Sequence, residues 1–152
     1  MINRAIEITK FSSHRVREAV IAGFCRTPFG KYRGGLSDIE ATKLGSIAIS
    51  GLLDSLSLNP MSGVIDGVYM GMVLQAGAGQ APARQASIGA GLPFDTPATT
   101  LNKVCGSSLK AVMIAAMEIE SGRSNVIIAG GMESMSRAPM IAENVSKGEP
   151  VE

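Results

Sequence analysis

The spacing of apolar residues changes several times along the chain, and each spacing predicts a different kind of element. Over residues 36–56, leucine and isoleucine recur at helical intervals, with Ser37 in the position of an N-cap and Glu40 three residues later. A second helical pattern runs over residues 83–93 and ends in glycine and proline, which commonly terminate helices. Both stretches are therefore predicted to be helices.

Runs of apolar and β-branched residues bounded by glycine and proline predict strands. Four such runs occur, at residues 17–28, 63–74, 97–104 and 124–135. Because strands and helices alternate, the chain is predicted to be an α/β protein of βαβαβ type. Its sheet is expected to be mixed but mostly parallel, with right-handed crossovers.

One predicted helix differs from the others in its pattern. Residues 109–120 follow the third predicted strand and are apolar on nearly every face from Ala111 to Met117. Such a helix is expected where protein surrounds it on all sides, so it is predicted to be a buried central helix. After Arg137 no clear periodicity remains, and the chain is expected to end before its fold does.

Length and composition narrow the class of protein. With 152 residues, of which 45% are hydrophobic, the chain fits one domain with a substantial core. A net charge of +1 and an aromatic content of 4% argue against nucleic acid as a partner, which requires a basic face and stacking surface. No stretch approaches the roughly 20 apolar residues of a membrane span.

The first residues bear on location in the cell. Residues 1–16 lack the apolar core of a secretory signal, so the protein is expected to be cytoplasmic. Their basic, serine-containing character keeps mitochondrial import as the alternative, although Glu7 and the short length of this leader argue against it.

The two cysteines, Cys25 and Cys105, and the single histidine, His14, have neither metal-ligand spacing nor a disulfide framework. Cys105 follows a predicted strand and precedes a helix, where functional groups of α/β proteins gather. The helix dipole favours its thiolate by only about 0.3–1 kcal/mol, so full activation requires a base such as histidine. Gly106 leaves room for a ligand, but a buried, unreactive cysteine stays an open alternative.

Four other features carry weaker signals. Cys25 ends an apolar strand pattern and is interpreted as structural filler. The glycines of residues 75–82 lack the lysine of a phosphate-binding loop and any dinucleotide fingerprint, so a plain loop or a subunit contact is favoured. Glu133 follows a Gly-Gly turn near a possible helix start. Ser107 and Ser108 are interpreted as helix caps.

Two segments together resemble the thiolases. LNKVCGSSLKA at residues 101–111 resembles the acyl-enzyme segment of that family, and GGMESMSRAP at residues 130–139 resembles another characteristic segment. The likeness extends over nearly all of the chain from about Arg17 and is nearest to the biosynthetic, acetoacetyl-CoA type. It implies a thiolase-like fold with residues 17–137 as part of the N-terminal domain core, 1–16 as a leader and 138–152 as the start of a loop region.

The resemblance also implies a chemistry. Cys105 corresponds to the nucleophile that takes up an acyl group, and its backbone N–H to an oxyanion donor. The acyl group then passes to the enolate of acetyl-CoA or back to CoA, so that two acetyl-CoA give acetoacetyl-CoA plus CoA reversibly. Coenzyme A thioesters are substrates, no separate cofactor or metal is implied, and a full-length homodimer or homotetramer is expected. The residues that bind CoA stay unassigned.

The departures from the family pattern limit this expectation. Ser108 stands where most members have glycine, and the family's catalytic histidine, second cysteine and an Asn-Glu segment come from a C-terminal half that this chain lacks. His14 is interpreted as a solvated residue that does not substitute. Little or no turnover is expected, together with an exposed apolar face that promotes association.

Two other classes of function stay open. One is a non-catalytic module that binds acyl-CoA or lipid, or that serves as a subunit contact. The other is a ketoacyl synthase, which the GGMESMS segment disfavours.

Overall fold

The computed structural model describes residues 17–140, and its centre is a sheet of three parallel strands. The strands are β1 (Gly67–Gly71), β2 (Ala98–Leu101) and β3 (Ile127–Gly131), in the order β2-β1-β3. Each lies inside a run that the sequence predicted, although each is shorter than that run. The predicted α/β class with a parallel sheet is confirmed.

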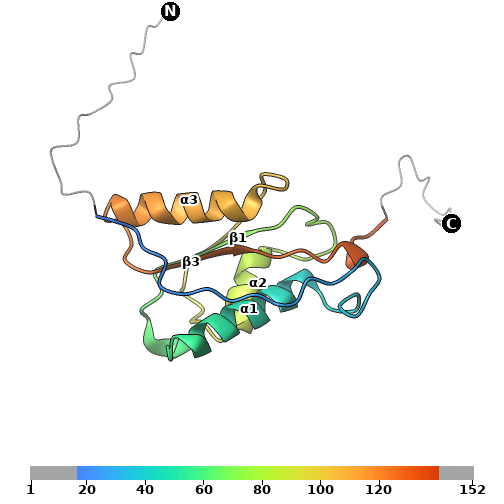
Figure 1. Ribbon diagram of the computed structural model, residues 1–152, viewed down its shortest axis with the longest axis horizontal. Helices are drawn as coiled ribbons and strands as arrows, with labels where there is room; N and C mark the ends of the chain where they lie inside the picture. The colour runs from blue at the N-terminus through green and yellow to red at the C-terminus, as the bar shows by residue number, and fades with distance from the viewer. Residues whose placement is uncertain (1–16, 141–152) are drawn as a thin grey trace, which may run out of the picture.

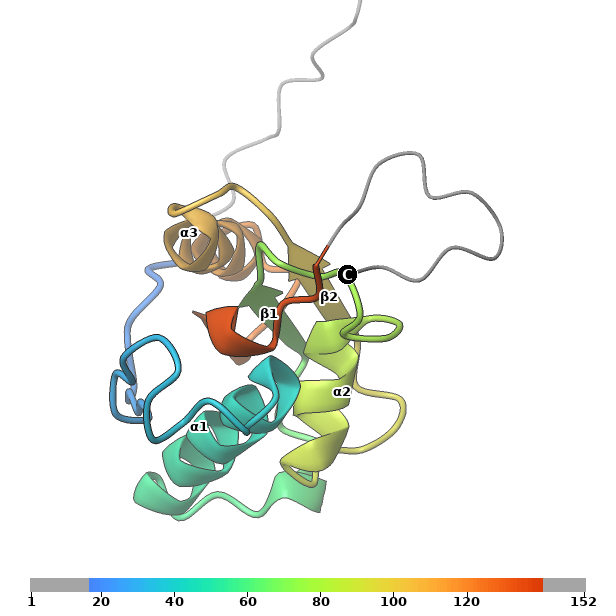
Figure 2. The same ribbon diagram turned by 90° about the vertical axis from the view of Figure 1, so that its right-hand side faces the viewer.

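Helices cover both faces of this sheet. Helices α1 (Ala41–Ser55) and α2 (Pro82–Gly89) pack together on one face, and α3 (Ser107–Glu120) lies alone on the other, as Figure 1 and Figure 2 show. Two short 3-10 helices, η1 (Pro60–Ser62) and η2 (Met135–Arg137), lie in the connections. The result is three layers with the sheet in the middle.

Successive side chains of β1 point to opposite faces of the sheet, toward α1 and α2 on one face and toward α3 on the other. Val68 and Met70 are buried in the hydrophobic core shared with α1 and α2. Tyr69 is directed to the opposite face, where its hydroxyl donates to Glu118 of α3 at 2.6 Å. This period of two is what a strand with both faces covered requires. The core itself is formed mainly by Ile49, Leu53, Val68, Met70, Met72, Ala83, Ala86 and Ile128.

Helix α3 is covered on one side only among the described residues. Ala111 and Ala115 are buried because small side chains let the helix lie close to the sheet. The opposite side exposes large apolar residues, namely Leu109, Val112, Met113 and Met117. The prediction that protein surrounds this helix on all sides is therefore wrong for the part of the chain described, and the expected exposed apolar face is confirmed.

The N-terminal segment, residues 17–39, is the largest difference from the predicted elements. The run 17–28 was predicted to be a strand, but no strand is present there. Its ends lie beside the two ends of β3: Arg17 Nη1 donates to Asn125 Oδ1 at 2.7 Å, and the Arg33 N–H donates to Ser136 Oγ at 2.8 Å. Between these two contacts, no described strand forms backbone hydrogen bonds with the segment. The segment is therefore not part of the sheet.

The start of α1 also differs from the prediction. The helix begins at Ala41 with Glu40 as its N-cap, and no side chain caps it. Ser37 instead lies in a turn in which its N–H donates to the carbonyl of Gly34. The C-terminal signal of α2 was predicted correctly, because Gly91 takes the left-handed φ of 89° directly after the C-cap Ala90.

No helix within residues 17–140 is long and apolar enough to cross a membrane. The leader 1–16, with His14, lies outside the described residues, as does most of the loop region that the sequence predicted at 138–152.

Candidate functional site

Residues 102–108, here called the cysteine turn, connect β2 to α3. Most of the backbone N–H groups in this turn donate hydrogen bonds within it. Val104 takes a left-handed φ of 49°, which is unusual for a β-branched residue and costs on the order of 1–3 kcal/mol. Ser107 holds this conformation, because its buried hydroxyl donates to the Val104 carbonyl at 2.6 Å and accepts from the Lys103 N–H at 2.8 Å. Ser107 was predicted to be a cap, but it pins the turn instead.

The N–H of Cys105 is the exception in this turn. The N–H groups of Val104, Gly106 and Ser107 are all bonded within the turn, to Asn102 Oδ1, the Lys103 carbonyl and the Val104 carbonyl respectively. The N–H of Cys105 makes no such bond to the turn carbonyls or side chains of the described residues, and its backbone lies at an isolated bridge with Lys103. The side chain of Cys105 is exposed at the same point, one residue before the N-cap of α3. Among residues 17–140 the thiol and the N–H of Cys105 therefore lie together at the surface, and the side chain is not buried as the open alternative required.

Two glycines explain how the start of α3 approaches the sheet so closely. A Cβ placed on Gly71, the last residue of β1, would lie 2.6 Å from Ser107 Cβ and 2.7 Å from the Ser107 carbonyl carbon. A Cβ on Gly131, the last residue of β3, would collide with Ser108 Oγ. At Gly71 only glycine fits, because the clash is with backbone, whereas at Gly131 a larger residue would require Ser108 to change its side-chain conformation. Ser108, the departure from the family pattern, is accommodated here.

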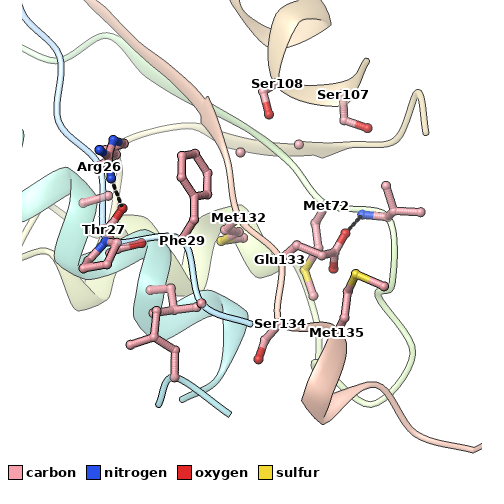
Figure 3. A pocket seen from close by; sticks show the side chains of 18 of the residues that line it. Arg26, Thr27, Phe29, Met72, Ser107, Ser108, Met132, Glu133, Ser134 and Met135 are labelled. Carbon is pink, nitrogen blue, oxygen red and sulfur yellow. Dashed lines mark hydrogen bonds between the residues drawn. The ribbon is translucent and has the colours of Figure 1, made fainter. Parts of the chain in front are cut away.

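A cavity of about 530 Å³ opens beside the cysteine turn. Its wall combines the carboxyl ends of β1 and β3, the start of α3 and residues 25–32 of the N-terminal segment. Figure 3 shows these contributions, with Ser107 and Ser108 from α3, Arg26, Thr27 and Phe29 from the N-terminal segment, and residues 132–135 after β3. The cavity and Cys105 lie at the carboxyl ends of the strands, where the sequence placed the candidate site.

Both cysteines line this cavity. Cys25 was interpreted as buried filler, but it is exposed, because the segment that carries it forms no strand inside the sheet. Its sulfur instead lies over α1, 2.8 Å from where a Cβ on Gly51 would be. Unlike Cys105, it has no helix N-terminus after it. Burial in a core is therefore not observed for Cys25, while its structural rather than catalytic role stays a prediction.

Positive charge on the cavity wall comes from Arg26 and Lys31, which sequence reasoning did not identify. The guanidinium of Arg26 lies 5.1 Å from the centroid of the Phe29 ring and donates to the Thr27 carbonyl at 3.1 Å. These cations are the described side chains suited to phosphate groups of a ligand in the cavity. Spacing gave no signal for them, because the loop that brings them to the site has no periodic pattern.

Glu133 is a second residue whose importance the sequence understated. Its carboxylate accepts from the Val73 N–H at 2.8 Å and from the Leu74 N–H at 3.3 Å, so the chain after β3 is bonded to the chain after β1. It lines the cavity beside the cysteine turn (Figure 3). Glu133 does lie near a helix start, directly before the N-cap Ser134 of η2, but its hydrogen bonds run to the chain after β1. Its place two residues after a Gly-Gly strand end was the available signal.

The glycine-rich residues 75–82 form a loop over a second cavity of about 270 Å³. Gly77 and Gly79 have left-handed φ values of 74° and 78°, and Gln85 Nε2 donates to the carbonyls of Ala78 and Gln80. This confirms the prediction of a loop. The glycines allow the left-handed backbone of this loop. Gln85 of the following helix α2 holds the loop through its side-chain hydrogen bonds.

The described residues contain no histidine and no group of three side chains able to hold a metal. A base for Cys105 is thus not supplied within residues 17–140. His14 lies outside them, so its expected lack of a catalytic role stays a prediction.

Two groups with shifted pKa values lie away from the cysteine turn and serve the fold. The N–H groups of Asn125 and Val126 lower the pKa of Asp66 by bonding its carboxylate at 2.6 and 3.0 Å. The hydrogen bond to Glu118 raises the pKa of Tyr69, with burial as a smaller cause. The first joins the starts of β1 and β3, and the second joins β1 to α3.

Comparison with known proteins agrees with this architecture. The profile of the family "Thiolase, N-terminal domain" matches residues 19–151. The chain is 55% identical over 126 residues to a mitochondrial acetyl-CoA acetyltransferase of Danio rerio, covering 83% of this chain and 30% of that protein. It is 49% identical over 138 residues to a protein of the same name in Homo sapiens, covering 91% and 32%. The chain thus spans about a third of the length of these relatives.

Proposed function

The chain belongs to the thiolase family, and from that premise we propose that Cys105 accepts the acyl group of an acyl-CoA thioester. The observation that carries the proposal is the cysteine turn, where the exposed thiol of Cys105 and its own backbone N–H lie side by side at the edge of a cavity. An acyl-transfer site requires such a pair, a nucleophile and a donor for the oxygen that becomes negative.

The first step transfers the acyl group to the enzyme. The Cys105 thiolate attacks the thioester carbonyl, and the new carbon–sulfur bond forms as the bond to CoA breaks. The N–H of Cys105 donates to the carbonyl oxygen while it carries negative charge, and CoA leaves as a thiolate that takes up the proton lost by Cys105. In the whole protein, the acyl group then passes to the enolate of acetyl-CoA, so that two acetyl-CoA give acetoacetyl-CoA and CoA.

The cavity supports a CoA thioester as the ligand. Arg26 and Lys31 place positive charge on its wall for the phosphates of CoA, while Met132 and the glycine ends of β1 and β3 leave an apolar floor for a short acyl group. No additional cofactor is required for this chemistry.

Turnover requires more than the described residues provide. The helix N-terminus stabilises a thiolate by only about 0.3–1 kcal/mol, and no histidine lies within residues 17–140 to take the thiol proton. We therefore expect the 152-residue chain to be acylated slowly and to give little or no condensation. The assembly into a homodimer or homotetramer is likewise expected of the longer protein.

Location in the cell is proposed to be mitochondrial. The relatives named above carry that location in their names, which favours the alternative that the sequence left open. The expectation of a cytoplasmic protein is not supported. Microscopy of the chain with a C-terminal fluorescent tag would test this, and diffuse cytosolic fluorescence would contradict it.

Mass spectrometry of the reduced chain after incubation with acetyl-CoA tests the function. We expect an acetyl group on the peptide that contains Cys105, still present in Cys25→Ser and lost in Cys105→Ser. An acetyl group found mainly on Cys25 would overturn the proposal. A chain that retains CoA thioester without acylation would favour the non-catalytic binding module.

A further inference from the structure

We propose that Glu133 and Asn102 are positioning residues that hold the N–H of Cys105 toward the acyl carbonyl, an inference that rests on the proposed function. They do so through hydrogen bonds that join the carboxyl ends of all three strands. Neither residue touches the reacting atoms, so each acts through the cysteine turn.

The first link runs from β3 to β1. Glu133 lies two residues after the end of β3, and its carboxylate accepts from the N–H groups of Val73 and Leu74, which follow β1. Figure 3 shows this carboxylate turned toward the backbone of that segment. A carboxylate that accepts two adjacent N–H groups fixes the position of the peptide between them.

The second link runs from β1 to β2. Asn102, directly after β2, donates through Nδ2 to the carbonyl of Val73 at 3.4 Å. The same residue thus meets the peptide segment that Glu133 holds from the other side. Its amide group is set between two backbones, which fixes which way its oxygen points.

The third link reaches the cysteine. Asn102 Oδ1 accepts from the N–H of Val104 at 2.9 Å, and Val104 has the left-handed φ of 49° that turns the next peptide. That next peptide carries the N–H of Cys105. Val104 is 65% exposed, so packing does not hold it in this conformation, and its hydrogen bonds must.

Removal of these hydrogen bonds should affect the oxyanion donor and not the thiol. Without these bonds the thiol of Cys105 stays exposed and reactive, but its N–H no longer stays aligned with an attacked carbonyl. Reactions that build negative charge on oxygen should therefore slow, whereas alkylation of the sulfur should not.

The test compares two reagents on the Cys25→Ser chain, which has Cys105 as its only thiol. Acylation by p-nitrophenyl acetate passes through an oxyanion and forms the acetyl-cysteine with release of p-nitrophenolate. Alkylation by iodoacetamide displaces iodide with no oxyanion, so the ratio of the two rates removes changes in thiol exposure and ionisation. We expect Asn102→Ala to lower this ratio about tenfold and Glu133→Ala about threefold, since each loosens an oxyanion donor rather than removing it.

Conservative variants separate positioning from general damage. Glu133→Gln keeps an oxygen for the Val73 N–H and should recover most of the ratio. Asn102→Asp keeps an oxygen for the Val104 N–H but loses the donor to the Val73 carbonyl, so it should recover only part of the ratio. Glu120→Ala is the matched control, because Glu120 is an exposed acid at the far end of α3. Its ratio should equal that of the parent chain.

The outcomes discriminate between the two proposals. Unchanged ratios in both alanine variants, with folded circular dichroism spectra, would overturn the positioning role. If the alanine variants unfold, Asn102→Gln decides, because its longer side chain misplaces the oxygen, and an unchanged ratio there would overturn it too. Failure of acetyl-CoA to acylate the parent chain, with the ester ratios behaving as expected, would instead overturn the proposed function alone.

Discussion

The cysteine turn and the N-terminal segment face each other across one cavity, but they are ordered in different ways. Within residues 102–108, serine, asparagine and backbone groups bond one another, so the sequence of the turn largely determines its shape. Residues 17–30 make no backbone hydrogen bond to another backbone group of the described chain. A turn can be specified locally, whereas an extended segment needs a neighbouring strand.

The largest expected effect of a single change lies under the cysteine turn. Gly71→Ala would place a methyl group against the backbone of Ser107 and Ser108, which cannot move aside as a side-chain end would. We expect a loss of about 3 kcal/mol in the free energy of unfolding, measured by urea denaturation. Gly35→Ala in the N-terminal segment is the matched control, because nothing lies within 4 Å of the added methyl group. Equal losses in the two variants would remove the contrast between the regions.

The next effect concerns two serines that the sequence presented alike, as helix caps. Ser107→Ala leaves the Lys103 N–H and the Val104 carbonyl without their side-chain partner in a partly buried turn, which costs about 1–3 kcal/mol. Ser37→Ala should cost under about 0.5 kcal/mol, because its hydroxyl caps nothing. Thermal unfolding of both variants measures the difference. A loss near 1 kcal/mol for Ser37→Ala would show a working cap.

A smaller effect, dependent on pH, lies at the opposite end of the sheet. Asp66 has a lowered pKa, so its stabilisation is present above the ordinary value of about 4 and is lost as the pH falls through the folded-state value. Asp66→Asn should lower the free energy of unfolding by about 1 kcal/mol at pH 7, with the gap to the parent chain closing toward pH 2. Asp38→Asn in the N-terminal segment is the control for stability at pH 7, because the carboxylate of Asp38 accepts no hydrogen bond from the described residues. A constant difference across this range would contradict the assignment.

The predictability of the fold follows the same contrast. The three paired strands and the three helices were found from periodicity, because burial on both faces of the sheet imposes that periodicity on the sequence. The strand predicted at 17–28 has the same composition, but pairing depends on a partner, and composition contains no information about one. For a similar reason the prediction that protein surrounds α3 fails. An apolar helix face indicates that burial is favourable, but it does not show that a covering element is present.

The candidate site was predictable only in part. Cys105 stands out because a strand end, a glycine and a helix start coincide there. Asn102 has no such signal and Glu133 only the Gly-Gly strand end before it, because their partners are backbone groups 29 and 60 residues away in the sequence. Side-chain to backbone bonds between strand ends leave no periodic trace, so only the three-dimensional arrangement reveals them.

The smallest effect on stability is expected where the apolar side chains of the N-terminal segment are most exposed. Ile21 and Phe24 are 83% and 89% exposed, so the double change Ile21→Ser with Phe24→Ser should alter the free energy of unfolding by less than about 0.5 kcal/mol. The same change should reduce concentration-dependent association, because it removes part of an exposed apolar patch. Sedimentation velocity over a range of concentrations measures this, with Met117→Ser on the exposed side of α3 as the comparison. If association falls only with Met117→Ser, the association surface is the exposed side of α3. A loss of more than about 1 kcal/mol in the free energy of unfolding of the double variant would contradict the exposed position of Ile21 and Phe24.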